Sequence, residues 1–241
     1  MTFINELRPL VFCAAKPSGV GISCQFNINA YRDSLFEDFT IALPSILREA
    51  SLRRKAEFLA GRYLAKIAMQ NLAIPASDIA IGAQRNPLWP SAVVGSISHS
   101  KNHAVCFMQA TRGVQLTDVG VGLDLETIID EPSARQILPS IISPEERKML
   151  CNQFTNDTQE DHFGFAFSLI FSAKESLFKA LYPNVGRYFD FLDVRLCALD
   201  TEAKQLTLQL LRDLSPSLRA GREILVRWQS HPIGLLTYIL P

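Results

Sequence analysis

The sequence has no excess of charge of either sign. Its 241 residues carry 24 Lys and Arg against 24 Asp and Glu, which gives a formal net charge of zero. Proteins that bind nucleic acid or an anionic membrane surface through their bulk charge show a basic excess, so both classes are disfavoured. No apolar run approaches the roughly 18 residues of a membrane span. Only a local basic patch remains possible.

Cysteine is scarce and unpatterned. There are five Cys, an odd number, and none is spaced as C-x-x-C or clustered with His at zinc-binding spacing. This pattern predicts buried free thiols in a reducing compartment. The apolar run at residues 9–15 has no basic segment before it, because Glu6 and Arg8 cancel. We therefore expect this run to form a strand of the fold rather than a signal peptide, and the protein to be cytoplasmic.

The chain divides into two halves of similar pattern, with a boundary near residue 115. The expected domains are residues 1–115 and residues 116–241. Each half combines helical segments with apolar runs that alternate as in a small antiparallel sheet, which predicts an α+β fold in two lobes.

Several elements follow from local patterns. In the first half, residues 44–72 carry an apolar stripe at steps of three and four, which is typical of a helix. Residues 93–99 and 104–108 are predicted to form a hairpin. Residues 86–90 are predicted to be a loop because they contain two prolines. In the second half, Ser143 and Glu146 form a capping box at a helix start. Residues 152–161 read as an exposed loop, and the expected strands are 119–126, 206–210, 224–228 and 235–240.

The segment G-V-G-L-D-L-E at residues 120–126 places two acids on one strand. Alternate side chains of a strand share a face, so Asp124 and Glu126 point the same way. Neighbouring carboxylates repel each other, and a divalent cation would offset that cost; oxygen ligands with open positions suit Mg²⁺. A solvated strand edge explains the two acids equally well.

Basic residues gather on the first long helix. Residues 48–66 include six Lys or Arg against two Glu, and His99 ends a later strand beside three serines. A solvated helix face and a structural histidine explain these features. The alternative is a phosphate site, for which Arg, His and the nearby Arg85 are suited.

The segment F-S-A-K-E-S-L-F-K-A-L-Y-P at residues 171–183 reads as most of a helix ended by a proline. Glu175 and Lys179 stand four residues apart and share a face. On this stretch alone, a surface ion pair contributing about 0.2–0.5 kcal/mol is a sufficient explanation.

Five motifs in order carry a resemblance to a known family. They are G-R-Y at 61–63, R-N-P-L-W-P at 85–90, G-S-I-S-H-S at 95–100, G-V-G-L-D-L-E at 120–126 and F-S-A-K-E-S-L-F-K-A at 171–180. This set resembles the 4′-phosphopantetheinyl transferases, and within them the longer, two-lobed, enterobactin-synthase type.

The resemblance implies a fold and an activity. Such enzymes have two similar α+β lobes related by a pseudo-twofold, with the active site in the cleft between them. They use Mg²⁺ to transfer the 4′-phosphopantetheine arm of coenzyme A to a serine of an apo acyl or peptidyl carrier protein, releasing adenosine 3′,5′-bisphosphate. The expected pathways are siderophore, nonribosomal peptide or polyketide biosynthesis, and the expected state is a monomer.

The resemblance also implies site residues. The metal ligands would be Asp124, Glu126 and Glu175, and Glu175 and Lys179 would be catalytic. Coenzyme A would be held by Arg53, Arg85, Asn86, Pro87, Ser98, His99 and Lys174. Arg62 is a weaker candidate, and a solvated position is favoured for Arg54, Lys55 and Lys66. Two alternatives are a relative that binds coenzyme A or a carrier without turnover, and an interaction domain whose acids and bases lie only at the surface.

Overall fold

A computed structural model describes residues 2–13, 17–112, 117–154 and 162–240. It confirms an α+β fold with antiparallel sheets. The chain forms two compact units, residues 1–116 and residues 117–241, and each has its own hydrophobic core.

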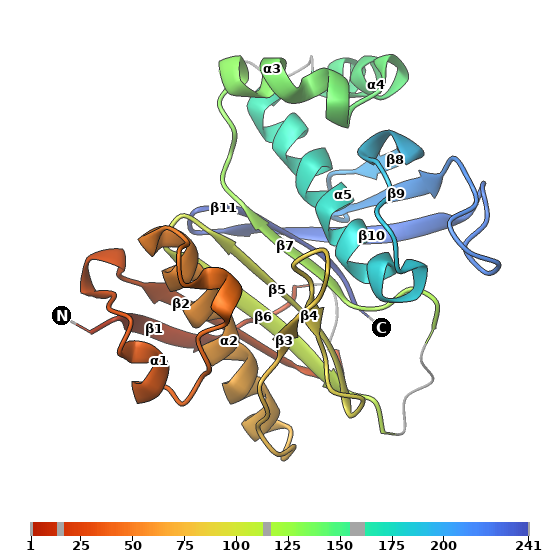
Figure 1. Ribbon diagram of the computed structural model, residues 1–241. Coiled ribbons are helices and arrows are strands. Elements are labelled where there is room, and N and C mark those ends of the chain that lie inside the picture. Colours follow the sequence, from red (N-terminus) through yellow and green to blue (C-terminus); the bar gives the residue numbers. More distant parts are fainter. Residues whose placement is uncertain (1, 14–16, 113–116, 155–161, 241) are drawn as a thin grey trace. The chain divides into compact units, whose positions relative to one another are not determined.

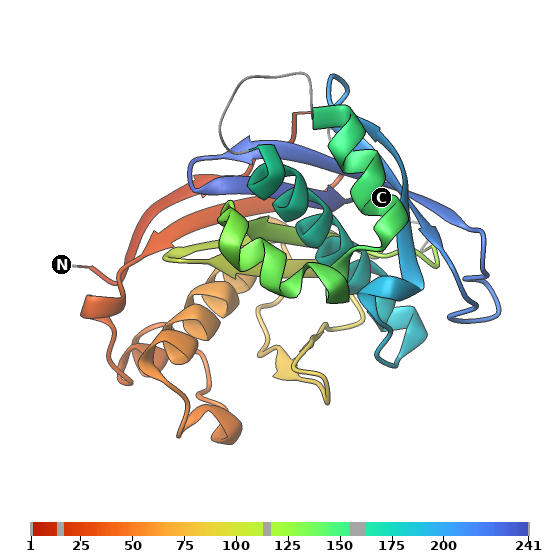
Figure 2. The same cartoon turned by 90° about the horizontal axis from the view of Figure 1, so that it is seen from above.

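The N-terminal unit is a four-stranded antiparallel sheet with a long helix on one face. The sheet has the order β1-β2-β6-β5, formed by Ile4–Pro9, Val20–Phe26, His103–Ala110 and Val93–Ser100. Helix α2 (Leu52–Asn71) packs on this sheet in both views (Figure 1, Figure 2). Short elements complete the unit: η1 (Ile28–Ala30), α1 (Leu35–Asp38), η2 (Ser45–Leu47), β3 (Ala80–Ile81) and β4 (Pro87–Leu88).

Local chemistry explains where α2 begins. Ser51 caps the helix by accepting a hydrogen bond from the backbone N–H of Arg54. The predicted helix over residues 44–72 therefore starts later than expected, at Leu52, and its first part is the separate turn η2. The hairpin of β5 and β6 is confirmed, with Lys101 in the left-handed region at φ 51° in its turn.

Two other predictions for this unit were wrong. The apolar run at residues 9–15 is not the first strand, because β1 ends at Pro9; residues 14–16 lie outside the described residues. Residues 86–90 are not wholly loop, because Pro87 and Leu88 pair with Ile81 and Ala80. Proline can join such a two-residue ladder at an edge position, where its missing N–H is not needed.

The C-terminal unit is a five-stranded antiparallel sheet covered by helix α5 (His162–Val185). The sheet order is β7-β11-β10-β9-β8, formed by Gly122–Glu126, Gly234–Ile239, Glu223–His231, Gln205–Leu210 and Val194–Asp200. Helices α3 (Glu131–Ile141) and α4 (Pro144–Phe154) pack against α5, and η3 (Phe191–Asp193) precedes β8 (Figure 1).

The predicted start of α4 is confirmed, and the predicted end of α5 is wrong. The capping box is confirmed: the N–H of Glu146 donates to Ser143 Oγ at 3.2 Å, and the N–H of Ser143 donates to Glu146 Oε2 at 2.8 Å. Pro183 does not end α5, which continues to Val185. Most of the loop predicted for residues 152–161 lies outside the described residues, and α4 extends to Phe154.

Candidate active site

Two glycines let α5 approach strand β7 closely. A Cβ atom at Gly122 would collide with the backbone carbonyl of Ser176, and the N–H of Gly120 donates to the carbonyl of Ala180 at 3.0 Å. Glycine is required where one backbone approaches another this closely. The consequence is that side chains of β7 and α5 meet over a short distance.

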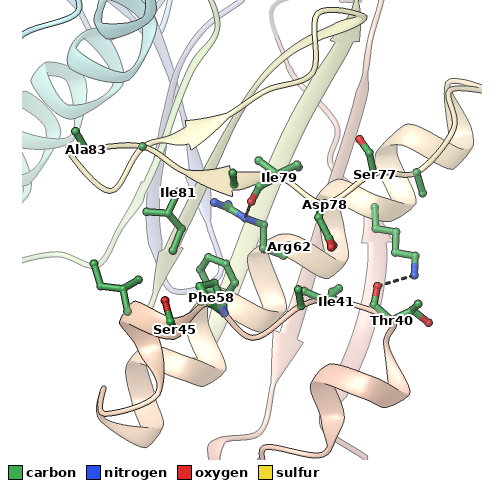
Figure 3. Close-up of a pocket in the computed structure, with 17 residues that line it drawn as sticks. Thr40, Ile41, Ser45, Phe58, Arg62, Ser77, Asp78, Ile79, Ile81 and Ala83 are labelled. Atoms are coloured by element: carbon green, nitrogen blue, oxygen red, sulfur yellow. Dashed lines mark hydrogen bonds between the residues drawn. The ribbon is translucent and has the colours of Figure 1, made fainter.

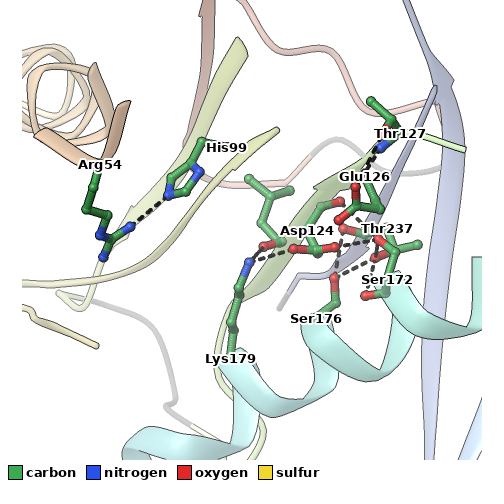
Figure 4. Close-up of polar contacts among 10 residues, drawn as sticks. Arg54, His99, Asp124, Glu126, Thr127, Ser172, Ser176, Lys179 and Thr237 are labelled. Carbon is green, nitrogen blue, oxygen red and sulfur yellow. Dashed lines mark hydrogen bonds and ion pairs between the residues drawn. The ribbon is translucent and has the colours of Figure 1, made fainter. Parts of the chain in front are cut away.

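Asp124 on β7 pairs with Lys179 on α5. The side chain of Asp124 is 7% exposed, so the alternative of a solvated strand edge does not hold for this residue. Lys179 Nζ lies 2.7 Å from Asp124 Oδ1 and also donates to the carbonyl of Leu123 at 3.1 Å (Figure 4). Lys179 therefore reaches β7 rather than forming only a pair along its own helix.

Glu175 is the second acid of this cluster. Burial raises the pKa of the Glu175 carboxyl, the ammonium of Lys179 opposes the rise, and the charges of Asp124 and Glu126 add to it. The Glu175 carboxylate therefore interacts electrostatically with both Asp124 and Glu126. A carboxyl group with a raised pKa beside a cation is a common feature of catalytic sites.

The donor set of Asp124, Glu126 and Glu175 fits a divalent cation by its chemistry, since three carboxylates that repel one another gain from a shared positive charge. In this conformation they do not converge. Glu126 Oε1 accepts a hydrogen bond from the N–H of Thr127 at 2.9 Å. Among the described residues, no group of three or more His, Cys, Asp or Glu side chains has the arrangement of a metal site.

The side chain of Lys174 lies inside the C-terminal unit. It is 1% exposed, and Nζ lies 2.9 Å from Glu146 Oε1. The same ammonium donates to the carbonyls of Ile141, Phe191 and Val194 at 2.8, 3.1 and 2.8 Å. The donors of Lys174 are all used inside the unit, so the predicted contact of Lys174 with coenzyme A would require these internal bonds to be exchanged.

In the N-terminal unit, His99 lies between a carboxylate and a guanidinium. His99 Nδ1 is 3.7 Å from Glu57 Oε2, and Arg54 Nη1 is 3.2 Å from His99 Nε2 (Figure 4). Burial raises the pKa of Glu57, and the charges of Arg54 and Arg53 oppose the rise. Arg53 is 58% exposed and lies 4.0 Å from Glu57 Oε1. The group is a half-buried basic cluster around one histidine.

The remaining candidates for coenzyme A binding lie on β5 and the loop before it. Ser98 is buried on β5, next to His99. Arg85 is exposed and holds φ at 62°, and its N–H donates to the carbonyl of Gly82 at 2.9 Å. Asn86 packs its side chain on Gly82, and Asn86 Oδ1 accepts no hydrogen bond from the described residues. Pro87 follows in β4, so these residues form one tight turn.

A pocket of about 860 Å³ adjoins this turn (Figure 3). Its walls are mostly apolar, with Ile79, Ile81 and Phe58 among them. Arg62 is 8% exposed, its Nε donates to the carbonyl of Ile79 at 3.1 Å, and its guanidinium lies 4.6 Å from the centroid of the Phe58 ring. Burial lowers the pKa of Arg62 to about 10. The pocket therefore combines mostly apolar walls with the buried cation of Arg62, and Lys66 and Asp78 also line it.

Sequence reasoning missed several residues of these clusters. Arg54 was expected in solvent but contacts His99, and Lys55 was expected in solvent but is 9% exposed and paired with Asp33 at 3.0 Å. Glu57 was not singled out. Its place one turn from Arg53 and Arg54 was visible, but only the fold brings the hairpin residue His99 to that face of α2.

Comparisons with known proteins agree with the sequence resemblance. Residues 43–109 match the 4′-phosphopantetheinyl transferase N-terminal domain, and residues 120–235 match the 4′-phosphopantetheinyl transferase superfamily. Enterobactin synthase component D of Salmonella typhi is 33% identical over 193 residues, which cover 80% of this chain and 74% of the relative. The 4′-phosphopantetheinyl transferase Svp of Streptomyces mobaraensis is 32% identical, over 66% of this chain and 60% of its own length.

A third relative is also a 4′-phosphopantetheinyl transferase. The 4′-phosphopantetheinyl transferase PptT of Mycobacterium tuberculosis is 29% identical over 64% of this chain and 62% of its own. Within the described ranges, no helix has the length and apolar character needed to cross a membrane. The two family matches follow each other along the sequence in the order of the two units. The chain belongs to the 4′-phosphopantetheinyl transferase superfamily.

Proposed function

We propose that the chain transfers the 4′-phosphopantetheine arm of coenzyme A to a serine of an apo acyl or peptidyl carrier protein, with Mg²⁺, and releases adenosine 3′,5′-bisphosphate. Transfer from coenzyme A to a carrier protein is the general activity of the superfamily to which the chain belongs. The metal, the second product and the roles of individual residues are the finer parts of the proposal.

The observation that carries the proposal is the cluster of Asp124, Glu175 and Lys179. A buried carboxylate, a half-buried carboxyl with a raised pKa and an ammonium lie together on β7 and α5. An acceptor for the serine proton and a cation for phosphate oxygens are the two groups that phosphoryl transfer needs from a protein. Burying such charged groups costs free energy, and charged groups with a perturbed pKa are typical of functional sites.

The reaction can be written on these side chains. The carrier serine oxygen forms a bond to the phosphorus that bears the pantetheine arm, and the bond from that phosphorus to the bridging pyrophosphate oxygen breaks. The serine proton passes to the Glu175 carboxylate, directly or through water, for which a raised pKa is suited. Lys179 offsets the charge on the phosphoryl oxygens.

Asp124, Glu126 and Glu175 would hold the Mg²⁺. The bound ion would supply positive charge to the pyrophosphate oxygens and so improve the leaving group. Binding requires Glu126 to turn from the N–H of Thr127 and Asp124 Oδ1 to share its contact with Lys179.

The N-terminal unit would bind the nucleotide end of coenzyme A. Arg53, Arg54 and His99 offer donors to its phosphates, and Ser98 and Arg85 lie in the same segment as His99 and in the turn before it. The pocket beside Gly82 has apolar walls for an adenine ring, and Arg62 offers it a buried cation. Asn86 and Pro87 follow Gly82 in the turn beside this pocket. Lys174 is left out of this set because its donors are satisfied internally.

The partner is proposed to be a carrier protein of siderophore, nonribosomal peptide or polyketide biosynthesis, since relatives include enterobactin synthase component D. We place the reaction in the cytoplasm, with a monomeric enzyme. Cys13, Cys24, Cys106 and Cys197 are free thiols, in keeping with a reducing compartment. Burial raises the pKa of Cys24 and of Cys106 to about 12, so neither is reactive, whereas Cys13 is exposed and does not fit the predicted burial.

The test is the intact mass of an apo peptidyl carrier protein after incubation with the protein, coenzyme A and Mg²⁺, with EDTA in a parallel sample. A gain of one phosphopantetheine arm that EDTA prevents is expected. If the gain persists with EDTA, the Mg²⁺ part of the proposal is wrong. No gain on apo acyl and apo peptidyl carriers, together with an increase in melting temperature on adding coenzyme A, would support binding without turnover.

A further inference from the structure

We propose that Ser172 on α5 and Thr237 on β11 are positioning residues for the Asp124 carboxylate. The inference rests on the proposed function, because its consequence concerns how Asp124 meets a divalent cation. It adds residues that are neither ligands nor acids. Their role is to fix which oxygen of Asp124 faces the reacting groups.

Hydroxyl residues of two different elements surround the side chain of Asp124. Thr237 is directly opposite Asp124 in the ladder between β11 and β7. Ser172 reaches the same place from α5, with Ser172 Oγ 2.7 Å from Asp124 Oδ2 and 2.9 Å from Thr237 Oγ1 (Figure 4). One turn along α5, Ser176 Oγ lies 2.7 Å from Thr237 Oγ1. All three hydroxyl residues have an exposed fraction of 0%.

The protons of this network can be assigned from its acceptors. Ser172 has one hydroxyl proton, and the ionised carboxylate is the strongest acceptor within reach, so Ser172 donates to Asp124 Oδ2. Because the Ser172 proton is committed to Asp124, Thr237 is the donor in the 2.9 Å contact between Thr237 Oγ1 and Ser172 Oγ, and it shares this proton with the backbone carbonyl of Ser172 at 2.8 Å. Ser176 donates toward Thr237, whose carbonyl is 3.0 Å from Ser176 Oγ. The network is satisfied without water.

The two oxygens of Asp124 are thereby separated in function. Oδ2 is held on the inner side by a hydroxyl, and Oδ1 is turned to Lys179 Nζ. Without Ser172, Oδ2 would lose its hydroxyl donor in a buried place. The carboxylate would then either rotate toward another donor or remain buried without that hydrogen bond, at a cost in free energy. Groups that orient a metal ligand in this way typically change metal affinity by about 10- to 100-fold when removed.

A matched control lies on the same helix. Ser168 is one turn before Ser172 and is also fully buried. Its Oγ donates to the carbonyl of Gly164 at 2.7 Å and accepts from the N–H of Ile129 at 2.8 Å, and neither partner belongs to the acid cluster. Ser168→Ala therefore removes a comparable buried hydroxyl without touching Asp124.

The experiment measures Mn²⁺ affinity by the electron paramagnetic resonance signal of free Mn²⁺, on the full chain without coenzyme A or carrier. We expect Ser172→Ala to bind Mn²⁺ about 10- to 100-fold more weakly than wild type. Ser168→Ala should bind like wild type, and Asp124→Ala should lose the site. Wild-type affinity in Ser172→Ala, with the site lost in Asp124→Ala, overturns the inference and leaves the proposed function intact.

The Thr237 variants give a second route if Ser172→Ala does not fold. Thr237→Val keeps the shape and removes the hydroxyl, and should weaken Mn²⁺ binding, whereas Thr237→Ser keeps the hydroxyl and should restore it. Equal affinities in these two variants overturn the inference for Thr237. If wild type and Asp124→Ala bind Mn²⁺ alike or not at all, the proposed metal site itself fails, and the inference with it.

Discussion

Replacing Lys174 by Met tests whether this lysine belongs to the fold or to the coenzyme A site. In the structure, its ammonium has four acceptors: a Glu146 carboxylate and three backbone carbonyls. Glu146 in turn accepts from the N–H of Leu196 at 2.7 Å, so the pair joins α4, α5 and β8. Lys174→Met keeps much of the side-chain length and removes only the charge and the donors.

The expected cost is large because both charges are buried. The side chains of Lys174 and Glu146 are 1% and 2% exposed. Breaking such a pair from one side leaves an uncompensated charge and costs about 3–5 kcal/mol in the free energy of unfolding. Lys174→Met combined with Glu146→Gln should recover part of that loss, because no unpaired charge then remains.

Urea unfolding and the KM for coenzyme A separate the two roles. For Lys174→Met we expect a much lower urea midpoint, and an ordinary KM at temperatures where the variant is folded. The control is Lys179→Met, whose lysine is 26% exposed and which should lose transfer with a smaller change in the midpoint. An unchanged midpoint together with a raised KM in Lys174→Met would refute the structural role.

Three further predictions concern other residues of the site. Glu175→Gln should stabilise the protein at neutral pH in the absence of divalent cations. The folded protein binds the Glu175 proton more tightly than the unfolded chain does, so the wild type loses stability as the pH rises from the usual Glu pKa through the raised one. Thermal melts of both proteins across pH should therefore show a difference in melting temperature that grows over this range, and a constant difference would contradict the raised pKa. Gly122→Ala should cost about 1–3 kcal/mol in urea unfolding and should lower transfer, since its methyl group meets the Ser176 carbonyl; a neutral effect would contradict the close packing of α5 on β7. Glu57 lies beside His99 Nδ1, so Glu57→Gln should weaken the positioning of His99 and raise the KM for coenzyme A severalfold, with Mn²⁺ affinity unchanged. The control is Glu49→Gln, at an exposed position, and an unchanged KM in Glu57→Gln would remove Glu57 from the site.

The sequence was sufficient for features that depend on local pattern. The capping box at Ser143, the hairpin of β5 and β6 and the last three strands follow from spacing, and the structure confirms them. Ordered motifs were sufficient for the family. The sequence placed the end of α5 at Pro183, because a proline inside a helix removes a backbone hydrogen bond. The helix nevertheless continues to Val185, since most of the stability of a helix in a protein comes from its packing.

The roles of single charges could not be predicted in the same way. Lys174 and Lys179 both lie on the motif-bearing helix, and nothing in the sequence tells which of them is buried. Only the packing of α4 and β8 around α5 encloses Lys174 and leaves Lys179 partly exposed. Arg54 looked like any solvated helix residue until His99 was placed beside it. Gly120 and Gly122 lie in the segment predicted as a strand, but their use in close packing could not be predicted because it depends on α5, more than 50 residues away.

The most direct measurement is to follow both products in one reaction of the protein with coenzyme A, Mg²⁺ and an apo carrier protein. We expect the carrier to gain one phosphopantetheine arm while adenosine 3′,5′-bisphosphate is released in equal amount, and Asp124→Ala to yield neither product. A carrier that gains mass without release of the bisphosphate would contradict the proposed reaction. Unchanged yields in Asp124→Ala would contradict the site on β7 and α5.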